Sequence, residues 1–222
     1  MPASNIQAQE DIIVATGLPV ESDLFKAAEE VLIIISDRMK REFKLISIPG
    51  KRASILLKNN EIHAEFTRVS EYAKKVPSAI KVAEPIIELS HYAYSIQKDF
   101  EVDGWGSLKP YRTVAMRGAW IIEIFMAEQN VSLMDSMDSA FKFLLSGRAD
   151  IYVANSIQAD MFLATENYAE HGVKRLEPAI FTSREYTFFA KDYSELAQRY
   201  ERALKAMKAD GSYNKILAKI GM

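Results

Sequence analysis

The chain has 222 residues, of which 49% are hydrophobic and 26% are charged, and its formal net charge is -2. Such a length and balance are typical of a globular protein with one large domain or two smaller lobes. The small net charge excludes a broad cationic surface for nucleic acid or an anionic membrane, and the lack of cysteine excludes disulfides, thiol catalysis and cysteine-bound zinc.

No apolar run approaches the roughly 20 residues that a membrane-spanning helix needs. The longest run covers only residues 31–35. The N-terminus has no basic region followed by an apolar stretch, so it does not resemble a signal peptide. Taken alone, this leaves two interpretations: a cytosolic protein, or an exported protein whose signal peptide has been removed.

The first predicted elements are a buried strand and a long amphipathic helix. Residues 11–16 form an apolar, largely β-branched run that ends at Gly17, as buried parallel strands do. Residues 22–43 follow a helical period, with Ser22 as a candidate N-cap. By composition the run 31–35 also fits a strand, but the helical period continues on both sides of it and favours a helix.

Strand and helix patterns then alternate along the chain, which predicts an α/β fold with parallel sheets covered on both faces. Residues 56–66 and 144–153 share a helix–turn–strand pattern, which suggests two similar halves. The predicted strands cover residues 11–16, 44–48, 62–66, 79–82, 89–96, 112–116, 131–134, 150–154, 173–176 and 185–190. The predicted helices cover residues 22–43, 53–58, 118–128, 139–145, 157–165 and 194–209, with a last helix ending at 220.

Four segments in order resemble the amino-acid-type extracellular solute-binding proteins (family 3) of ABC transporters. They are the helix–turn–strand 56–66 with its continuation to residue 86, the strand into glycine at 111–118, the "LSGRADI" segment at 145–151, and "LKAMKADGSYNKI" at 204–216. The resemblance implies the two-lobed, type II periplasmic binding fold with two hinge crossings. Lobe one would comprise residues 1–95 plus 187–222 and lobe two residues 96–186, with a ligand cleft between them that closes by hinge motion.

The ligand-binding positions of that family are altered in this chain. Tyr72 stands where the family's arginine binds the ligand carboxylate, and Asn155 stands where an acidic residue binds the ligand ammonium. Ala119, followed by Trp120, replaces the family's serine or threonine. The resemblance therefore implies a divergent ligand site.

Arg68 and Tyr72 are the candidate ligand contacts after the third predicted strand. Arg68 ends that strand, where α/β proteins place ligands, and its guanidinium suits bidentate binding of a carboxylate. The alternative is a surface arginine with a salt-bridge partner. Tyr72 offers a hydroxyl and a ring face, and its alternative is a half-buried structural tyrosine.

Arg117, Gly118 and Trp120 are the candidates at the start of a predicted helix. Free N–H groups and the helix dipole at such a terminus favour an anion, and Trp120 offers a ring for stacking. The alternatives are a tight turn at Gly118, a solvated Arg117, and a tryptophan packed within its own lobe.

Asn155 and Glu21 complete the predicted ligand site. Asn155 lies at a strand's C-terminal end, where it can bind a ligand, cap the next helix, or do both. Glu21 lies in the loop after the first strand, close to the expected cleft.

No catalytic motif is present, so we predict that the chain is not an enzyme. The sequence has no Gly-x-Ser-x-Gly, phosphate-loop or Gly-x-Gly-x-x-Gly motif. We expect no cofactor and no metal, because the three histidines, His63, His91 and His171, lack ligand spacing. One enzyme alternative is a periplasmic dehydratase on the same fold with a buried acid–base glutamate, for which Glu65 and Glu185 are candidates.

The predicted function is capture of a small polar or anionic organic solute, an amino acid or related carboxylate, for delivery to a membrane ABC transporter permease. The resemblance implies a periplasmic location, with the signal peptide removed, and we expect a monomer that does not bind nucleic acid. The alternative outside transport is the ligand-sensing ectodomain of a signalling system.

Overall fold

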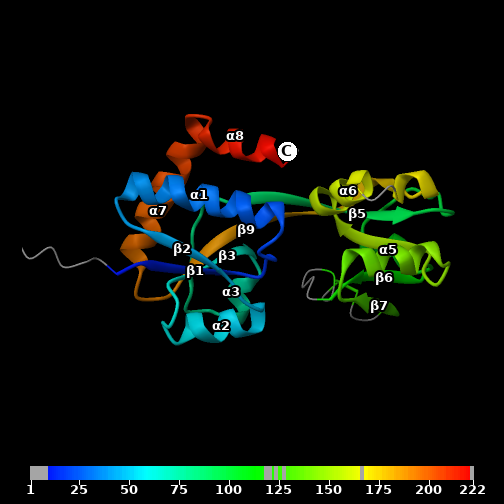
Figure 1. Cartoon of the computed structure of the whole chain (residues 1–222). Coiled ribbons are helices and arrows are strands. Elements are labelled where there is room, and N and C mark those ends of the chain that lie inside the picture. The colour runs from blue at the N-terminus through cyan, green and yellow to red at the C-terminus, as the bar shows by residue number, and fades with distance from the viewer. Residues whose placement is uncertain (1–9, 118–121, 123–124, 127–128, 166–167, 221–222) are drawn as a thin grey trace, which may run out of the picture. The chain divides into compact units, whose positions relative to one another are not determined.

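The computed structural model describes residues 10–117, 122, 125–126, 129–165 and 168–220 (Figure 1). The chain divides into two compact units: residues 1–87 with 184–222, and residues 88–183. Both boundaries fall inside strands, because β5 (Ile87–Ser95) and β9 (Lys174–Phe189) each begin in one unit and end in the other. Among the described residues, no helix has both the length and the apolar character needed to cross a membrane.

The first unit is a mixed sheet between two helical layers (Figure 1). Its strand order is β2-β1-β3-β9, with β1 parallel to both β2 and β3, β9 antiparallel to β3, and β4 also pairing with β9. Helices α1, α7 and α8 cover one face of the sheet, and α2 and α3 cover the other. The elements of this unit are β1 (Ile12–Thr16), α1 (Asp23–Met39), β2 (Phe43–Ser47), α2 (Gly50–Lys58), β3 (Ala64–Val69), α3 (Tyr72–Lys75), β4 (Ile80–Lys81), the C-terminal part of β9, α7 (Ser194–Ala209) and α8 (Ser212–Lys219).

The predicted first helix and its cap are confirmed, but the helix ends at Met39 and not at residue 43, where β2 begins. The Ser22 hydroxyl accepts a hydrogen bond from the backbone N–H of Phe25, which satisfies one of the free donors at the start of α1. The ambiguous run 31–35 is helical: Val31, Leu32 and Ile35 are buried, whereas Ile33 is 59% exposed. The 3.6-residue period therefore describes this segment better than its β-branched composition does.

The second unit has the strand order β5-β8-β6-β7, in which β6, β7 and β8 are parallel and β5 is antiparallel to β8. The first half of β9 follows β5, and the hydroxyl groups of Ser90 and Thr182 lie 2.9 Å apart there. The other elements described in this unit are the 3-10 turn η1 (Trp105–Leu108), β6 (Thr113–Met116), β7 (Val131–Met134), α5 (Met137–Leu145), β8 (Ile151–Asn155), α6 (Ser156–Thr165) and η2 (Tyr168–His171).

One structural difference from the sequence prediction concerns β9. The predicted separate strands 173–176 and 185–190 are parts of one strand, Lys174–Phe189. Pro178 interrupts the sequence pattern, but this part of β9 lies at the end of the second unit's strand order. An edge strand tolerates proline, because one side of its backbone has no neighbouring strand to bond.

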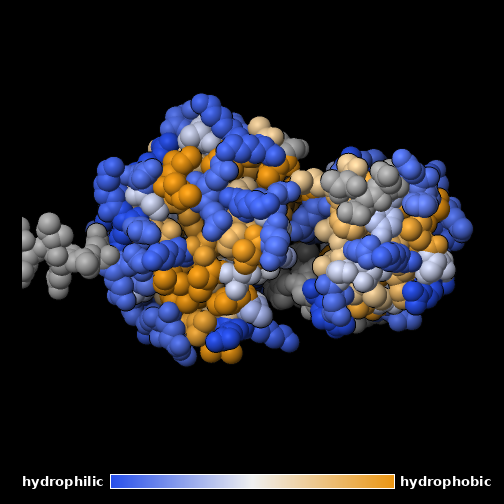
Figure 2. Space-filling model, viewed as in Figure 1, coloured by the Kyte–Doolittle hydropathy of each residue, from blue (hydrophilic) through white to orange (hydrophobic). Residues whose placement is uncertain are grey.

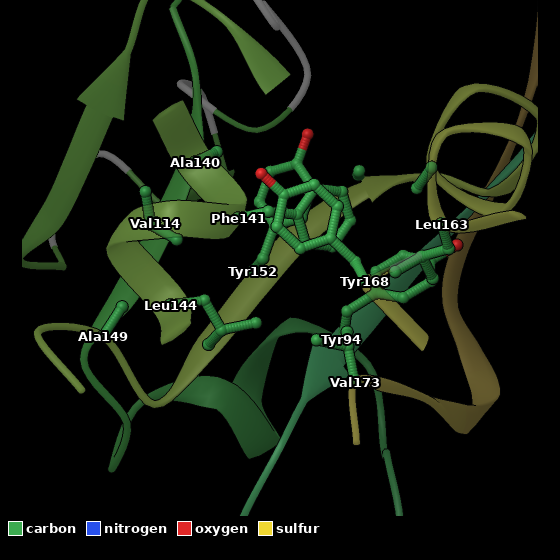
Figure 3. Close-up of a cluster of buried hydrophobic side chains, with 12 residues drawn as sticks. Tyr94, Val114, Ala140, Phe141, Leu144, Ala149, Tyr152, Leu163, Tyr168 and Val173 are labelled. Carbon is green, nitrogen blue, oxygen red and sulfur yellow. The ribbon is translucent and has the colours of Figure 1, made fainter. Parts of the chain in front are cut away.

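Aromatic side chains form much of the second unit's core (Figure 3). Phe141 of α5 contacts Tyr152 of β8 at a ring-centroid distance of 4.8 Å, and it stacks on Tyr168 at 5.1 Å. Tyr94 of β5 lies 6.2 Å from Tyr152, and both residues are completely buried. The Tyr94 hydroxyl donates to Asp160 at 2.7 Å, whereas the Tyr152 hydroxyl has no hydrogen-bond partner among the described residues.

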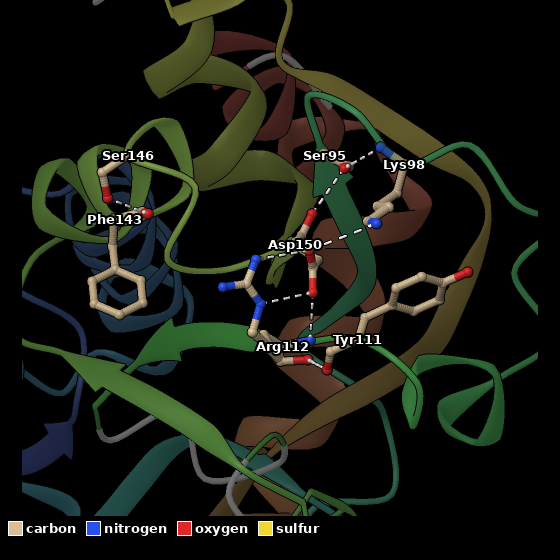
Figure 4. Close-up of polar contacts among 8 residues, drawn as sticks. Ser95, Lys98, Tyr111, Arg112, Phe143, Ser146 and Asp150 are labelled. Atoms are coloured by element: carbon tan, nitrogen blue, oxygen red, sulfur yellow. Dashed lines mark hydrogen bonds and ion pairs between the residues drawn. The ribbon is translucent and has the colours of Figure 1, made fainter.

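Asp150 joins the beginnings of two parallel strands in the second unit (Figure 4). Its carboxylate accepts hydrogen bonds from the backbone N–H of Arg112 at 2.9 Å and from the Arg112 guanidinium at 3.1 Å. Its backbone carbonyl accepts a hydrogen bond from Ser95 at 2.8 Å. These bonds from Arg112 hold the pKa of Asp150 below its ordinary value. The aspartate of the "GRAD" segment therefore has a structural role.

Among the described residues, β2 is the edge strand of the first unit's sheet. Ile33 of α1 and Ile55 of α2 are each 59% exposed, and Figure 2 shows apolar side chains gathered over the region of β2 and α2. Lys44 of β2, which is paired with Asp11 at 2.6 Å, places charge on this edge. Exposed lysines are a common protection of sheet edges against unwanted strand pairing.

Tyr94 and Tyr152, two of the buried tyrosines of Figure 3, give a matched test of hydrogen bonding in the core. We expect Tyr94→Phe to lower the free energy of unfolding by about 1–2 kcal/mol, because the hydrogen bond from the hydroxyl of the buried ring to the Asp160 carboxylate is lost. Tyr152→Phe should change it by less than about 0.5 kcal/mol or stabilise the protein, because no bond is lost. Urea unfolding measures both, and equal losses would contradict the assignment.

Asp150→Asn should lower the free energy of unfolding by about 1–3 kcal/mol at neutral pH, since charged hydrogen bonds to Arg112 are weakened. Because folding lowers the pKa of Asp150, its contribution is present above about pH 4 and is lost as the pH falls through the lowered value. The difference between variant and wild type should therefore shrink on acidification. Unfolding curves from pH 7 to pH 3 test this, and a difference independent of pH would contradict it.

Candidate ligand-binding site

The candidate site begins where the parallel strands β1 and β3 end. Thr16 closes β1, and its hydroxyl lies 3.1 Å from that of Thr67 in β3. Thr67 has a φ of 59°, and the pairing of β3 with β9 shifts register between Glu65 and Arg68. A positive φ is strained for a β-branched residue, and such outliers concentrate at functional sites. The bulge redirects the side chains that follow it.

Glu65 and Arg68 form an ion pair across this bulge. The Arg68 Nε donates to Glu65 Oε2 at 2.6 Å, with the Glu65 side chain fully buried and the Arg68 side chain 19% exposed. A carboxylate without any solvent contact requires a compensating charge, and Arg68 supplies it. Arg68 is therefore both the counter-charge of a buried acid and the member of the pair that solvent reaches.

Tyr72, at the start of α3, lies beside this pair. The Arg68 guanidinium carbon is 5.5 Å from the centroid of the Tyr72 ring, which packs edge-on against Phe188 at 4.9 Å. Burial raises the pKa of the Tyr72 hydroxyl above its usual range, an effect that Ser54 partly offsets and Glu65 increases. At neutral pH the hydroxyl is thus a neutral group that can donate and accept.

Gly50 provides the space that the guanidinium occupies. A Cβ atom at this first residue of α2 would lie 3.0 Å from Arg68 Nη2 and 3.3 Å from Nη1. Ser54, one turn further along α2, donates its hydroxyl hydrogen to the Gly50 carbonyl at 2.9 Å. The beginning of α2 thus forms one wall of the space around Arg68.

Three buried polar atoms of this cluster have no hydrogen-bond partner among the described residues: Glu65 Oε1, Arg68 Nη2 and the Tyr72 hydroxyl oxygen. Buried polar groups in folded proteins are normally paired, so several unpaired ones together indicate capacity for further hydrogen bonds. The cluster combines donors, an acceptor and a hydroxyl without a nucleophile or metal ligand set. This arrangement is suited to binding a polar molecule.

The candidates in the second unit are placed separately. Arg117 is 60% exposed and pairs with Asp135 at 2.7 Å, and its guanidinium also donates to the Leu133 carbonyl at 3.3 Å. Its side chain therefore lies in solvent with an ionic partner in its own unit. Gly118 and Trp120 lie outside the described residues.

Asn155 is half-buried and caps α6, as the capping interpretation predicted. Its Oδ1 accepts from the Gln158 backbone N–H at 3.1 Å, and its Nδ2 donates to the Gln158 side chain at 2.8 Å. Glu21, in the first unit, is exposed in the turn before α1. The structure brings Arg68 and Tyr72 together, and it places Arg117 and Asn155 in a different unit from them.

Sequence reasoning missed Gly50 and Ser54 and considered Glu65 only as a catalytic acid. No short motif marks these residues, because α2 and β3 meet only in the folded chain. Glu185, the other glutamate considered, is buried and is not without a partner. Within the described part of the chain, no group of three or more potential metal-binding side chains occurs.

Comparison with known proteins supports the resemblance. No protein-family model matches the chain. Over 207 residues it is 28% identical to an uncharacterized protein of Shewanella oneidensis, and the match covers 89% of this chain and 76% of that protein. The similarity to this relative covers most of the chain, but the relative does not indicate which ligand is bound.

Solved structures with similar folds are binding and sensing proteins. A probable amino-acid ABC transporter extracellular-binding protein from Bacillus subtilis superposes with a TM-score of 0.73 and 16% identity, covering 95% of this chain and 97% of that one. A histidine kinase sensor domain with similarity to periplasmic binding proteins gives 0.73 and 15%, covering 94% and 95%. These likenesses confirm the predicted α/β, two-lobed periplasmic binding fold.

Arg68→Ala should lower the free energy of unfolding by about 3 kcal/mol, the lower end of the cost of breaking a buried pair, because Arg68 is partly exposed. The loss arises from Glu65, which would remain buried without a counter-charge. The double variant Arg68→Ala/Glu65→Gln should therefore lose less than the single variant. Urea unfolding of the three proteins tests this dependence, and wild-type stability of Arg68→Ala would refute it.

Proposed function

We propose that this protein is a non-enzymatic binding protein that captures a small polar organic solute, with Arg68 as its principal ligand contact. The single observation that carries the proposal is the cluster of unpaired buried polar atoms around Arg68 at the ends of β1 and β3. Ligands of open α/β sheets bind at the C-terminal ends of such strands. The likeness of the fold to an extracellular-binding protein supports the same conclusion.

Arg68 is held in place before any ligand arrives. The Glu65 carboxylate accepts a hydrogen bond from the Arg68 Nε, and the Tyr72 ring lies beside the guanidinium. Gly50 leaves room for the terminal nitrogens of Arg68. A guanidinium fixed in this way loses little side-chain entropy on binding, which favours affinity. Glu21 in the first unit and Arg117, Gly118, Trp120 and Asn155 in the second remain predicted contacts.

Delivery of the solute to a membrane ABC transporter, in the periplasm, is the transport role that we propose. The strands β5 and β9 pass from one unit to the other, and such crossings are suitable hinges for closure on a ligand. The likeness to the Bacillus subtilis ABC transporter extracellular-binding protein supports this proposal by analogy of fold.

A sensing role is the second candidate, supported by the likeness to a histidine kinase sensor domain. Both roles require capture of a solute. They differ only in the partner protein that recognises the ligand-bound form. An enzymatic role has less support. A glutamate that acts as acid or base must exchange a proton with its substrate, whereas Glu65 is ion-paired and fully buried.

A thermal-shift screen tests the proposal directly. The protein is unfolded and refolded to remove any carried ligand, then screened against amino acids and their amides, small carboxylates, polyamines and sugars. A solute at roughly 100 times its Kd should add about 2.7 kcal/mol to the free energy of unfolding and raise Tm by several degrees. No shift with any of these solutes would count against solute capture.

Tyr72→Phe is the matched variant for this screen. It removes only a hydroxyl that makes no hydrogen bond of normal geometry among the described residues, although Ser54 and Glu65 lie near it, so the free protein should lose less than about 1 kcal/mol of stability. The affinity for an active solute should fall about three- to tenfold if the solute bonds this hydroxyl, as measured by calorimetric titration. A Tyr72→Phe protein with unchanged affinity would remove Tyr72 from the site.

A further inference from the structure

We infer that Glu65 determines which charge the group bound by Arg68 can carry. The solute presents an uncharged acceptor to Arg68, such as an amide carbonyl or a hydroxyl, and not a carboxylate or phosphate. Glu65 is thus a specificity-determining residue that acts through Arg68. This inference rests on the proposed function and names the chemical class of its ligand.

The charge of Arg68 is already matched within the protein. Glu65 Oε2 lies 2.6 Å from Arg68 Nε, and no part of the Glu65 side chain reaches solvent. The pair is therefore close to neutral and is poorly screened by water. Tyr72, the third member of the cluster, is also uncharged, because burial raises the pKa of its hydroxyl.

An anion at Arg68 would add a second negative charge a few ångströms from the buried carboxylate. Like charges at such separations repel strongly in a poorly screened environment. Other cations near the start of α2 compensate little, since Lys51 and Arg52 are exposed and screened by solvent. Lys81 is bonded to Ser70 at 3.0 Å and lies over the Tyr186 ring.

A neutral acceptor avoids this repulsion and uses the bonds that remain. Arg68 Nη2 still has N–H donors without a partner among the described residues. A primary amide offers a carbonyl for the guanidinium and an N–H for a nearby acceptor such as the Tyr72 oxygen. The cluster therefore fits amide-like or hydroxyl-bearing groups better than acids.

Formate is a suitable probe, because it is the smallest carboxylate and does not depend on knowing the natural solute. Its apparent Kd is obtained from Tm against concentration, with potassium chloride as the ionic-strength control. We expect Glu65→Gln to bind formate at least tenfold more tightly than the wild type, because Arg68 becomes uncompensated. The double variant Glu65→Gln/Arg68→Gln should lose that gain.

Glu65→Asp is the matched control, because it shortens the side chain but keeps the charge. It should lose stability as any imperfect core substitution does, yet bind formate as weakly as the wild type. A merely structural role of Glu65 would affect Glu65→Asp and Glu65→Gln alike. Equal formate affinity in the wild type and Glu65→Gln would overturn the inference.

The wild type alone provides a second test, in case Glu65→Gln does not fold. Formate should stabilise the wild type no more than it stabilises Arg68→Gln. An apparent formate Kd of the wild type that is tenfold lower than that of Arg68→Gln would overturn the inference. For any acid found in the solute screen, its primary amide should bind the wild type at least tenfold more tightly. Failure of the screen would count against solute capture, whereas the formate result concerns Glu65 alone.

Discussion

The arrangement of side chains at the C-terminal ends of β1 and β3 depends on one buried charge. Glu65 has no contact with solvent, and a carboxylate in that position is stable only with a partner. Arg68 is that partner, and its placement in turn requires the bulge at Thr67, the small residue at position 50 and the ring of Tyr72. These local features are therefore parts of one arrangement.

Different interactions stabilise the second unit. Its sheet is joined at the strand beginnings by Asp150 and covered by the aromatic cluster around Phe141. Among the described residues, the Asp150 carboxylate is fully paired, whereas the aromatic cluster contains one unpaired group, the Tyr152 hydroxyl. The candidate site differs because three such atoms, from Glu65, Arg68 and Tyr72, gather around one guanidinium.

Periodicity and capping rules predicted the regular elements well, because those rules depend on neighbours in sequence. Ser22 and Asn155 were identified as candidate caps from their positions alone, and both cap helices. Arg68 was singled out as a residue at a strand end, and Tyr72 because it stands where the resembling family has its ligand-binding arginine. The ion pair of Arg68 with Glu65 was beyond prediction, because residues three apart on a regular strand point to opposite faces.

The bulge at Thr67 breaks this alternation of side chains and brings Glu65 into contact with Arg68. Thr67 adopts a backbone conformation that sequence rules assign to glycine or asparagine, so nothing in its identity marks the bulge. The merging of two predicted strands into β9 has a related cause. Proline interrupts a strand only where its missing N–H is needed, and an edge position is recognised only once the sheet order is known.

The close approach of Gly50 to Arg68 has a consequence for sequence divergence. With a Cβ only 3.0 Å from the guanidinium, any larger residue at position 50 would shift Arg68 by a few tenths of an ångström, so a chain that keeps the ion pair in this exact place favours glycine there. A chain that has lost Arg68 is released from that constraint. Positions 50, 65 and 68 should therefore covary among homologues, and this triplet would mark which of them retain the same site.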